Sequence, residues 1–358
     1  MLVPFEVKKI AVLRANGIGD LMFALPALAA LRAAYPGAEI VLLAKQWHAE
    51  FLQDRSGPVD RVIPIPAYPG VGAPENTSSH RPDLEAFFEN MAGENFDIAI
   101  QLHGGGRHSN PFVRRLGARL TIGLRSPGAV ALDRWVPYVY FQQEVIRYLE
   151  AVSLVSAKPV VLEPEIQVTR RDVAESEGAV PPDSRPLVVL HAGATDGRRR
   201  WAPERFGAVG AELTRRGFRV IVTGSREEEY LIRRVLEAMP CPGQGVSTLS
   251  LGGLAGLLSR AVLLVSNDSG PLHLGNAVGL ATVGIYWCGN LFTAGPMTRA
   301  RHRPAISWRL ECPLCGRNTI QDNCDHHVSF VDDVPVTEVI EHCLELLGTL
   351  AETNRQPV

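Results

Sequence analysis

No run of about 18 or more apolar residues occurs in the sequence, and this absence argues against a membrane-spanning helix. The N-terminal segment also lacks the long apolar core and the small-residue cleavage site of a secretory signal peptide. A formal net charge of −2 over 358 residues leaves no excess of positive charge for a nucleic-acid surface. These absences predict a cytoplasmic protein that binds no nucleic acid.

Cysteine is also scarce, and six cysteines in a cytoplasmic chain of this size do not indicate a disulfide framework. Three of them fall close together, at Cys312, Cys315 and Cys324, and His326 follows. The first pair has the spacing of half a zinc site, and a tetrahedral Cys3His set needs the other two ligands. The Cys-x-His spacing of the second half is irregular, so reduced structural thiols are the alternative to zinc.

The length of the chain favours two domains, since 358 residues exceed what one ordinary hydrophobic core holds. Strand-like and helix-like runs alternate in both halves, which predicts α/β units with parallel sheets covered by helices on both faces. In the first half the predicted strands are 9–13, 39–44, 59–65, 96–102 and 120–123, with a helix at 21–35. In the second half they are 187–190, 219–223, 262–266 and 282–286, with helices at 203–216, 227–239, 254–260, 272–278 and 336–347.

A polar stretch that contains four prolines lies between the two halves. We therefore predict a first domain at 1–165, a linker at 166–186 and a second domain at 187–358. A short helix at 170–177 inside the linker is left open. Two such α/β domains that face each other bind ligands in a cleft at the carboxyl ends of their strands. We expect the loops 15–20, 191–201 and 267–273 to line this interdomain cleft.

The clearest local motif is VLLVSNDSGPLH at 262–273, a strand that runs into Asp268-Ser269-Gly270 before a helix opens at Pro271. Asp and Ser suit a helix N-cap, proline suits the first turn, and glycine allows a close backbone approach. Free N–H groups at a helix start form a seat for a diphosphate. A capped turn without a ligand is the alternative. His273 is accordingly a phosphate contact or a core histidine.

Two further loops of the second half follow strands in the same way. Arg198, Arg199 and Arg200 lie in a small-residue turn after 187–190, where arginine suits bidentate phosphate recognition and a solvated basic loop is the alternative. The segment 223–228 repeats the strand-then-glycine arrangement. A carboxylate there would accept hydrogen bonds from ribose hydroxyls, or would simply favour a helix start.

The first half has one such turn at 15–20, which lacks the G-x-G-x-x-G spacing of a Rossmann dehydrogenase. Asp20 ends it and is the best-placed general base of this half, with helix capping as the alternative role. The glycine-rich loop 103–108 also follows a strand. It predicts either a wall of an acceptor pocket or a flexible turn.

Together these segments resemble glycosyltransferase family 9, the ADP-heptose:lipopolysaccharide heptosyltransferases. The resemblance rests on 8–40, 188–206, 220–229 and 264–280, which follow in the family's order. Its most specific part is the D-S-G-x-x-H element combined with the N-terminal G-D element. It implies a GT-B architecture of two facing Rossmann-like domains, a donor bound mainly by the second domain, and inversion at the anomeric carbon without a required metal.

The resemblance also implies roles for individual residues. Asp20, beside Gly19, would be the base that takes the proton of the acceptor hydroxyl, and Glu228 would reach the nucleoside sugar. Arg199 replaces a lysine that family members usually carry. The residues expected at the donor diphosphate are Asp268, Ser269, Gly270 and His273, and those expected on the acceptor side are Gly19, His103 and Arg107.

These observations predict an inverting glycosyltransferase that moves a heptose, or a related sugar, from a nucleotide diphosphate donor, ADP-heptose by resemblance. The acceptor would be a lipopolysaccharide core or another saccharide or glycolipid. No cofactor is required, and contact with the inner membrane would be peripheral at most. A nucleotide-sugar epimerase and a non-catalytic nucleotide-sugar-binding protein are the alternatives. The sequence leaves the sugar, the nucleotide base, the acceptor and the oligomeric state open, and Tyr286-Trp287-Cys288-Gly289 replaces the Phe-Gly pair frequent in the family.

Overall fold

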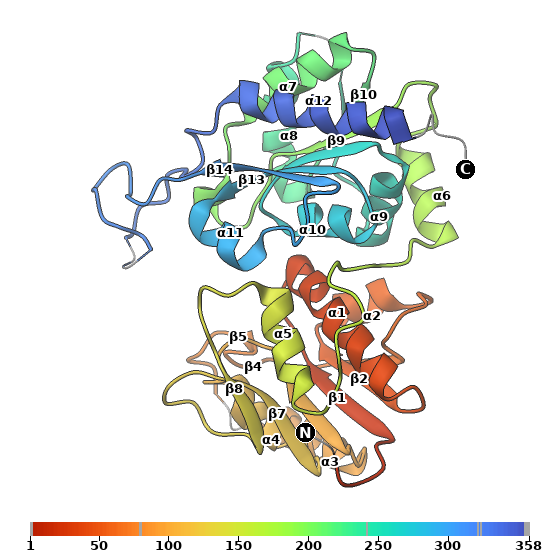
Figure 1. Cartoon of the computed structure of the whole chain (residues 1–358), viewed down its shortest axis with the longest axis vertical. Helices are drawn as coiled ribbons and strands as arrows, with labels where there is room; N and C mark the ends of the chain where they lie inside the picture. Colours follow the sequence, from red (N-terminus) through yellow and green to blue (C-terminus); the bar gives the residue numbers. More distant parts are fainter. Residues whose placement is uncertain (1–2, 79–80, 241–242, 321, 323, 354–358) are drawn as a thin grey trace. The chain divides into compact units, whose positions relative to one another are not determined.

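The computed structural model describes residues 3–78, 81–240, 243–320, 322 and 324–353 of the chain. The chain divides into two compact units, Met1–Gln167 and Val168–Val358. Each unit contains one six-stranded sheet in which all strand pairings are parallel (Figure 1). The predicted class, α/β with two parallel sheets, is therefore confirmed. Among the described residues, no helix has both the length and the apolar character needed to cross a membrane.

The first unit is built on a sheet with the strand order β3-β2-β1-β6-β7-β8. Its strands are β1 (Lys9–Leu13), β2 (Glu39–Ala44), β3 (Arg61–Pro64), β6 (Ile98–Gln101), β7 (Leu120–Arg125) and β8 (Arg134–Pro137). A short pair, β4 (Tyr68–Pro69) and β5 (Gly72–Ala73), lies outside this sheet. The helices are α1 (Ile18–Ala34), α2 (Gln46–Leu52), α3 (Pro82–Gly93), α4 (Ser109–Arg114) and α5 (Glu144–Ser153).

Helices cover both faces of this first sheet. Ala11 and Leu13 of β1 pack with Phe88 of α3 and Phe112 of α4 in one buried cluster. Side chains alternate along a strand, so Ile10 points to the opposite face, the side of α1 and α5, which pack on each other. Burial on both faces explains why β1 reads as the unbroken apolar run KIAVL.

The second unit repeats this plan with the strand order β11-β10-β9-β12-β13-β14. Its strands are β9 (Leu187–His191), β10 (Arg219–Thr223), β11 (Gln244–Val246), β12 (Leu263–Asn267), β13 (Thr282–Trp287) and β14 (His302–Ser307). Its helices are α6 (Arg170–Ala179), α7 (Pro203–Arg215), α8 (Glu229–Glu237), α9 (Leu251–Arg260), α10 (Gly270–Ala277), α11 (Cys288–Ala294) and α12 (Val336–Thr353), and its 3-10 turns are η1 (Gly197–Arg199) and η2 (Arg226–Glu228).

The core of the second unit contains the fully buried indole of Trp201. Its Nε1 donates to the Val334 carbonyl at 3.0 Å, and its ring meets that of Phe206 edge-on at a centroid distance of 5.1 Å. These contacts join the loop after β9 to α7 and to the segment before α12. The polar N–H of the indole is thereby satisfied inside the core.

The sequence pattern missed the short pair β4 and β5 and, among the described strands of the two six-stranded sheets, β8, β11 and β14. The last three lie at sheet edges or are short, and β8 and β11 are only partly buried, so none reads as a continuous apolar run. The segment 166–186, expected to be a linker, contains α6, which packs on α9. A Cβ at Gly256 would clash with the Asp172 carbonyl, so glycine allows these two helices to approach closely.

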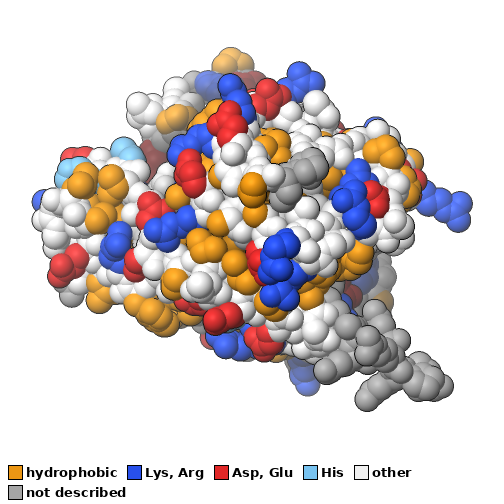
Figure 2. Space-filling view, turned by 90° about the horizontal axis from the view of Figure 1, so that it is seen from above, with side chains coloured by type: hydrophobic (Ala, Val, Ile, Leu, Met, Phe, Trp, Pro, Cys, Tyr) orange, Lys and Arg blue, Asp and Glu red, His pale blue; other side chains and the backbone are white. Residues whose placement is uncertain are grey.

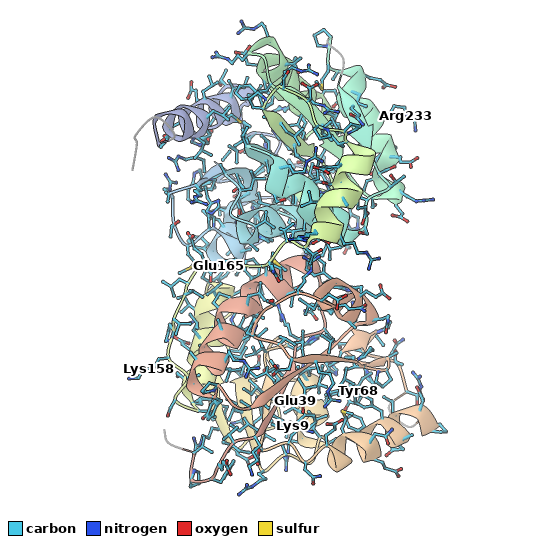
Figure 3. The ribbon with its side chains drawn as sticks, turned by 90° about the vertical axis from the view of Figure 1, so that its right-hand side faces the viewer. Lys9, Glu39, Tyr68, Lys158, Glu165 and Arg233 are labelled. Carbon is cyan, nitrogen blue, oxygen red and sulfur yellow. The ribbon has the colours of Figure 1, made fainter. Side chains whose placement is uncertain are left out.

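On the face in Figure 2, basic and acidic side chains are interspersed. A cluster of both charges lies at the amino ends of β1, β2 and β3. Lys9 Nζ lies 3.3 Å from a Glu39 oxygen and 2.9 Å from Glu94, and Lys9 and Glu39 are seen side by side in Figure 3. The hydrogen bond from Arg61 lowers the pKa of Glu94 to about 2; burial opposes this shift and Lys9 adds to it.

We expect Glu94→Gln to lower the free energy of unfolding on the order of 1 kcal/mol at pH 7, since the pair is partly exposed. Because the folded pKa of Glu94 lies below its ordinary value of 4.5, its contribution is full above pH 4.5 and is lost as the pH falls towards 2. Urea denaturation at several pH values should show the wild type and the variant converging in acid. Glu85→Gln, which removes an exposed partner of Arg115, should change little.

Candidate active site

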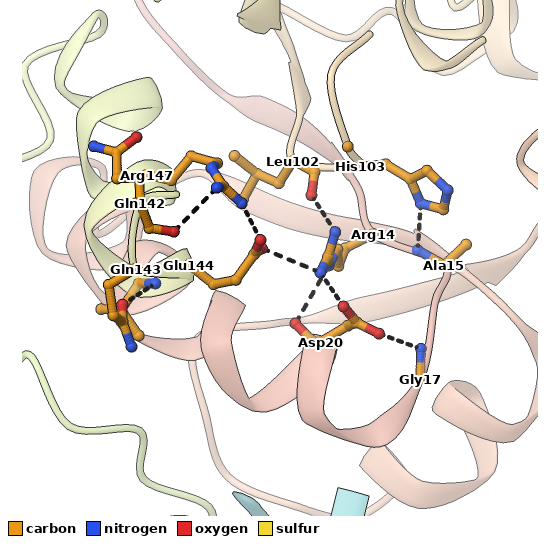
Figure 4. Close-up of polar contacts among 12 residues, drawn as sticks. Arg14, Ala15, Gly17, Asp20, Leu102, His103, Gln142, Gln143, Glu144 and Arg147 are labelled. Carbon is orange, nitrogen blue, oxygen red and sulfur yellow. Dashed lines mark hydrogen bonds and ion pairs between the residues drawn. The ribbon is translucent and has the colours of Figure 1, made fainter. Parts of the chain in front are cut away.

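Asp20 lies in the first turn of α1, directly after the loop that follows β1. Its Oδ2 accepts a hydrogen bond of 2.8 Å from the backbone N–H of Gly17, and its Oδ1 forms an ion pair with Arg14 (Figure 4). A Cβ at Gly17 would lie 3.2 Å from Oδ2, so a larger residue there would press on the carboxylate. The Asp20 side chain is nonetheless 36% exposed. The arrangement fixes a carboxylate in place and leaves it open to a ligand.

Arg14 is the buried group that positions this carboxylate. Its Nη1 donates to the Leu102 carbonyl at 2.8 Å, and its Nε donates to the Asp20 carbonyl at 3.3 Å (Figure 4). Its guanidinium carbon also lies 4.9 Å from the centre of the Tyr148 ring. One side chain therefore connects the ends of β1 and β6 with α5.

A second carboxylate, Glu144 at the start of α5, lies 3.6 Å from Arg14 and is also paired with Arg147. Burial raises the pKa of Glu144, and the charges of Arg14 and Arg147 oppose this effect. Arg147 is itself buried and donates to the carbonyls of Val139, Tyr140 and Gln142. Sequence reasoning missed Glu144 and Arg147, whose only local signal is a charged pair inside an amphipathic helix.

The glycine-rich loop after β6 lies beside the Asp20 turn. His103 accepts a hydrogen bond of 3.2 Å from the Ala15 N–H through Nδ1. Burial, and then the charge of Arg14, lower the pKa of His103 to about 4, so its ring is neutral at pH 7. The structure thus brings Gly19, Asp20 and His103 to one edge of the sheet. Arg107 is exposed on the same loop, and no described contact joins it to Asp20.

In the second unit, the predicted residues gather around Asp268, which is 1% exposed. Its Oδ1 lies 3.1 Å from His273 Nε2, and its Oδ2 lies 3.2 Å from Arg199 Nη1. Burial opposes ionisation of Asp268, but His273 and then Arg199 outweigh it, and the pKa of Asp268 lies below its ordinary value. The carboxylate therefore holds Arg199 and His273 at the start of α10.

The start of α10 has the features expected of an anion seat. Ser269 is the N-cap residue and its side chain makes no capping hydrogen bond. Its Oγ lies instead 3.2 Å from Ser266 Oγ. Pro271 has no N–H, and the N–H groups of Leu272 and His273 donate to the Ser269 carbonyl at 3.1 and 3.4 Å. No described hydrogen bond uses the N–H groups of Ser269 and Gly270, so these two are open to a ligand, next to the Arg199 guanidinium.

Asn267 ties the arginine loop to this helix start. Its Oδ1 accepts from the Trp201 N–H at 3.0 Å, and its Nδ2 donates to the Ala192 carbonyl at 2.8 Å. The neighbouring arginines have other partners, since Arg198 pairs with Asp196 and Arg200 donates to Ala194 and Tyr230. Of the three consecutive arginines, Arg199 is therefore the one that reaches Asp268.

Glu228 occupies the same sheet edge, after β10. Its Oε2 accepts from the Ser225 N–H at 2.9 Å. A Cβ at Gly193 would collide with the Glu228 carboxylate, and a Cβ at Gly224 would lie 3.2 Å from Glu228 Cβ. Two glycines thus make room for this carboxylate between the loops that follow β9 and β10. Glu228 is close enough to His191 that its charge opposes the lowering of the His191 pKa by burial.

The four predicted zinc ligands also come together, in the long loop between β14 and α12. The ligand atoms of Cys312, Cys315, Cys324 and His326 all lie within 4.8 Å of one another, and such a group could hold a metal ion. Cys288 and Cys343 are buried and free elsewhere in the unit, and Cys241 lies outside the described residues.

Comparisons with known proteins found relatives in one family. The model of "Glycosyltransferase family 9 (heptosyltransferase)" matches residues 84–306. Lipopolysaccharide heptosyltransferase 1 of Escherichia coli K12 is 25% identical over 290 residues, which cover 78% of this chain and 87% of that protein.

Solved structures of the same family share the fold. The glycosyl transferase family 9 structure from Veillonella parvula has a TM-score of 0.77 and 20% identity and covers 98% of this chain and 100% of its own. E. coli ADP-heptose lps heptosyltransferase II has a TM-score of 0.73 and 18% identity, with coverages of 96% and 99%. These likenesses confirm the GT-B fold.

We expect Asn267→Ala to lower the free energy of unfolding by roughly 2–4 kcal/mol, because it leaves the buried Trp201 N–H and Ala192 carbonyl without partners. Chemical denaturation would measure this loss, and hydrogen exchange should accelerate at the Trp201 amide. Ser259→Ala removes the hydrogen bond that the exposed Ser259 hydroxyl donates to the Gly256 carbonyl, and it should lower the free energy of unfolding by only a few tenths of a kcal/mol. Equal stabilities for the two variants would contradict the bridging role of Asn267.

Proposed function

Because the chain belongs to glycosyltransferase family 9, and so is a glycosyltransferase of the heptosyltransferase family, we propose that it transfers a heptose from ADP-heptose to a lipopolysaccharide core. The observation that carries this proposal is the Asp20 carboxylate, which is held at both oxygens and still exposed. The activities named for the relatives, lipopolysaccharide heptosyltransferase 1 and ADP-heptose lps heptosyltransferase II, support the sugar and the acceptor class. Transfer would proceed with inversion at the anomeric carbon.

Asp20 is proposed as the general base. Its carboxylate would take the proton of the acceptor hydroxyl as that oxygen bonds to the anomeric carbon. The contacts with Arg14 and Gly17 fix the position of the carboxylate, which favours proton transfer by pre-orienting the base. His103 and Gly19 would lie next to the acceptor, and Arg107 would contact it from the exposed part of the same loop.

The second unit is proposed to bind the donor. The bond between the anomeric carbon and the diphosphate breaks with both electrons moving to the diphosphate oxygen, so negative charge develops there. The N–H groups at Ser269 and Gly270, together with Arg199 and His273, would stabilise this charge. Asp268 supports the site by holding Arg199 and His273 rather than by meeting the phosphates. Glu228 would accept hydrogen bonds from the ribose hydroxyls.

No metal has a part in this proposed reaction, because helix N–H groups and cationic side chains carry the charge stabilisation. A metal at Cys312, Cys315, Cys324 and His326 would therefore serve the structure of the second unit. The lipid-linked acceptor would require no more than peripheral contact with a membrane.

The proposed function is tested with ADP-, GDP- and UDP-linked sugars, each incubated with and without a truncated lipopolysaccharide core. We expect release of ADP from ADP-heptose only when the core is present. Conversion of the donor sugar without any acceptor would indicate an epimerase. A donor that binds and never turns over would indicate a non-catalytic binding protein.

We expect Asp20→Asn to lower kcat by about 10² to 10⁴-fold, the usual contribution of a general base, with the donor KM changed little. Initial rates of ADP release measure both constants. Asp83→Asn is the control, because Asp83 pairs with Arg81 on the surface of α3. Asp20→Asn with wild-type kcat would refute the assigned role.

We expect Gly193→Ala to raise the donor KM about tenfold, because the new methyl group displaces the Glu228 carboxylate and a hydrogen bond to a charged group is lost. The fold should survive, since a flexible side chain can move away. Gly178→Ala in α6 is a matched control, because a Cβ there would meet no atom within 4 Å. An unchanged donor KM in Gly193→Ala would remove Glu228 from the donor site.

A further inference from the structure

The segment between β14 and α12 is a long loop that projects from the body of the second unit (Figure 1). It exposes three large apolar side chains, Trp308, Leu310 and Leu314, each at least 47% exposed. The described residues of this loop form no helix or strand, and a segment of this kind usually needs a cross-link or a metal to hold it. The cysteines and the histidine of this loop meet that need.

The ligand atoms lie close to the separations of a tetrahedral site. Cys312 Sγ lies 3.6 Å from His326 Nδ1, and all four ligand atoms lie within 4.8 Å of one another. Zinc–sulfur and zinc–nitrogen bonds of about 2.3 and 2.0 Å, at tetrahedral angles, separate sulfur from nitrogen by about 3.5 Å and sulfur from sulfur by about 3.8 Å. If the distances between the four ligand atoms shortened by about 1 Å or less, all four could therefore bond to one zinc ion.

The first pair of cysteines has a backbone built to present two sulfurs to one point. The Gly316 N–H donates to the Cys312 carbonyl at 2.9 Å, and the Cys312 N–H donates to the Arg317 carbonyl at 2.9 Å. Gly316 has a φ of +69°, which glycine adopts readily. This tight turn brings Cys315 back towards Cys312.

The composition of the set favours a thiolate-binding metal such as zinc over calcium and magnesium. Three thiolates and one imidazole are soft or borderline ligands, whereas calcium and magnesium prefer oxygen. A set of four protein ligands leaves no open position, which is typical of structural zinc rather than catalytic zinc. A disulfide between two of the cysteines would leave unexplained why His326 points its Nδ1 at Cys312.

We propose that Cys312, Cys315, Cys324 and His326 bind one Zn²⁺ that fixes this loop to the second unit. On one side of the site, the Arg309 carbonyl accepts from Trp287 Nε1 at 2.7 Å. On the other side, the Phe330 N–H donates to the Arg198 carbonyl at 2.8 Å. The zinc site thus joins the end of β13 to the turn that carries Arg199.

The same segment continues this support towards α7. The Ala202 N–H donates to Asp332 Oδ1 at 3.1 Å, and a Cβ at Gly197 would lie 3.6 Å from the His327 carbonyl. The zinc is therefore expected to order the backbone on which the arginine turn rests. The expected effect of zinc on the arginine turn rests on the proposed donor site, whereas zinc binding itself does not.

The test is the metal content of the full-length protein, measured by inductively coupled plasma mass spectrometry after expression in medium supplied with both zinc and iron. We expect about one zinc per chain in the wild type and less than a tenth of that in Cys315→Ser and in Cys324→Ser. Cys315 is exposed, so its substitution leaves the packing of the core intact. Cys343→Ala, which changes a cysteine in α12 outside the cluster, should retain the full amount.

Thermal unfolding provides a readout that does not depend on activity. Removal of zinc from the wild type with a chelator should lower Tm on the order of 5 °C, and zinc should restore it, whereas Cys315→Ser should not respond to either. One iron per chain would overturn the assignment of zinc. A metal-free wild type, or full zinc in both serine variants, would overturn the site. An inactive protein that holds one zinc would contradict the proposed function and leave the zinc site standing.

Discussion

Parallel strand pairing is the constraint on which both units depend. All strands of a parallel sheet end at the same edge, so the loops that follow β1 and β6 meet there, and so do those that follow β9, β10 and β12. Asp20 and His103 come together in the first unit for this reason, although the sequence separates them widely. Arg199, Glu228 and Asp268 come together in the second unit for the same reason.

At these two sheet edges, buried charged side chains hold one another in place through ion pairs. Arg14 stands between Asp20 and Glu144 in the first unit, and Asp268 stands between Arg199 and His273 in the second. A buried charge without a partner is costly, and each of these has at least one close partner of opposite charge or a hydrogen-bonding partner. The two sites therefore present fixed groups, a carboxylate in one and a cation beside a helix start in the other.

The loop that contains the cysteine cluster is stabilised in a different way. Trp308, Leu310 and Leu314 are exposed, and the loop is anchored to the body of the unit by the Arg309 carbonyl at one end. At the other end it is anchored from Phe330 to Val334, where apolar side chains are buried. Between these two anchors, the four proposed ligands of one metal would take the place of a hydrophobic core. The sequence anticipated the ligands from their residue types. It did not anticipate that the loop ends against the arginine turn.

The sequence by itself determined the α/β class, the central strands and the turns that carry Asp20 and Asp268, because buried parallel strands read as apolar runs that end in glycine-containing turns. It missed β8 and β11, whose partial burial gives no such run, and it left open whether the stretch expected to be a linker contains a helix, which the structure shows as α6. Only the tertiary structure decided that Arg199, and neither neighbour, pairs with Asp268, and that Glu144 and Arg147 support Arg14. Such pairings depend on which strand ends and helices become neighbours in space. They therefore cannot be predicted from the spacing of residues along the chain.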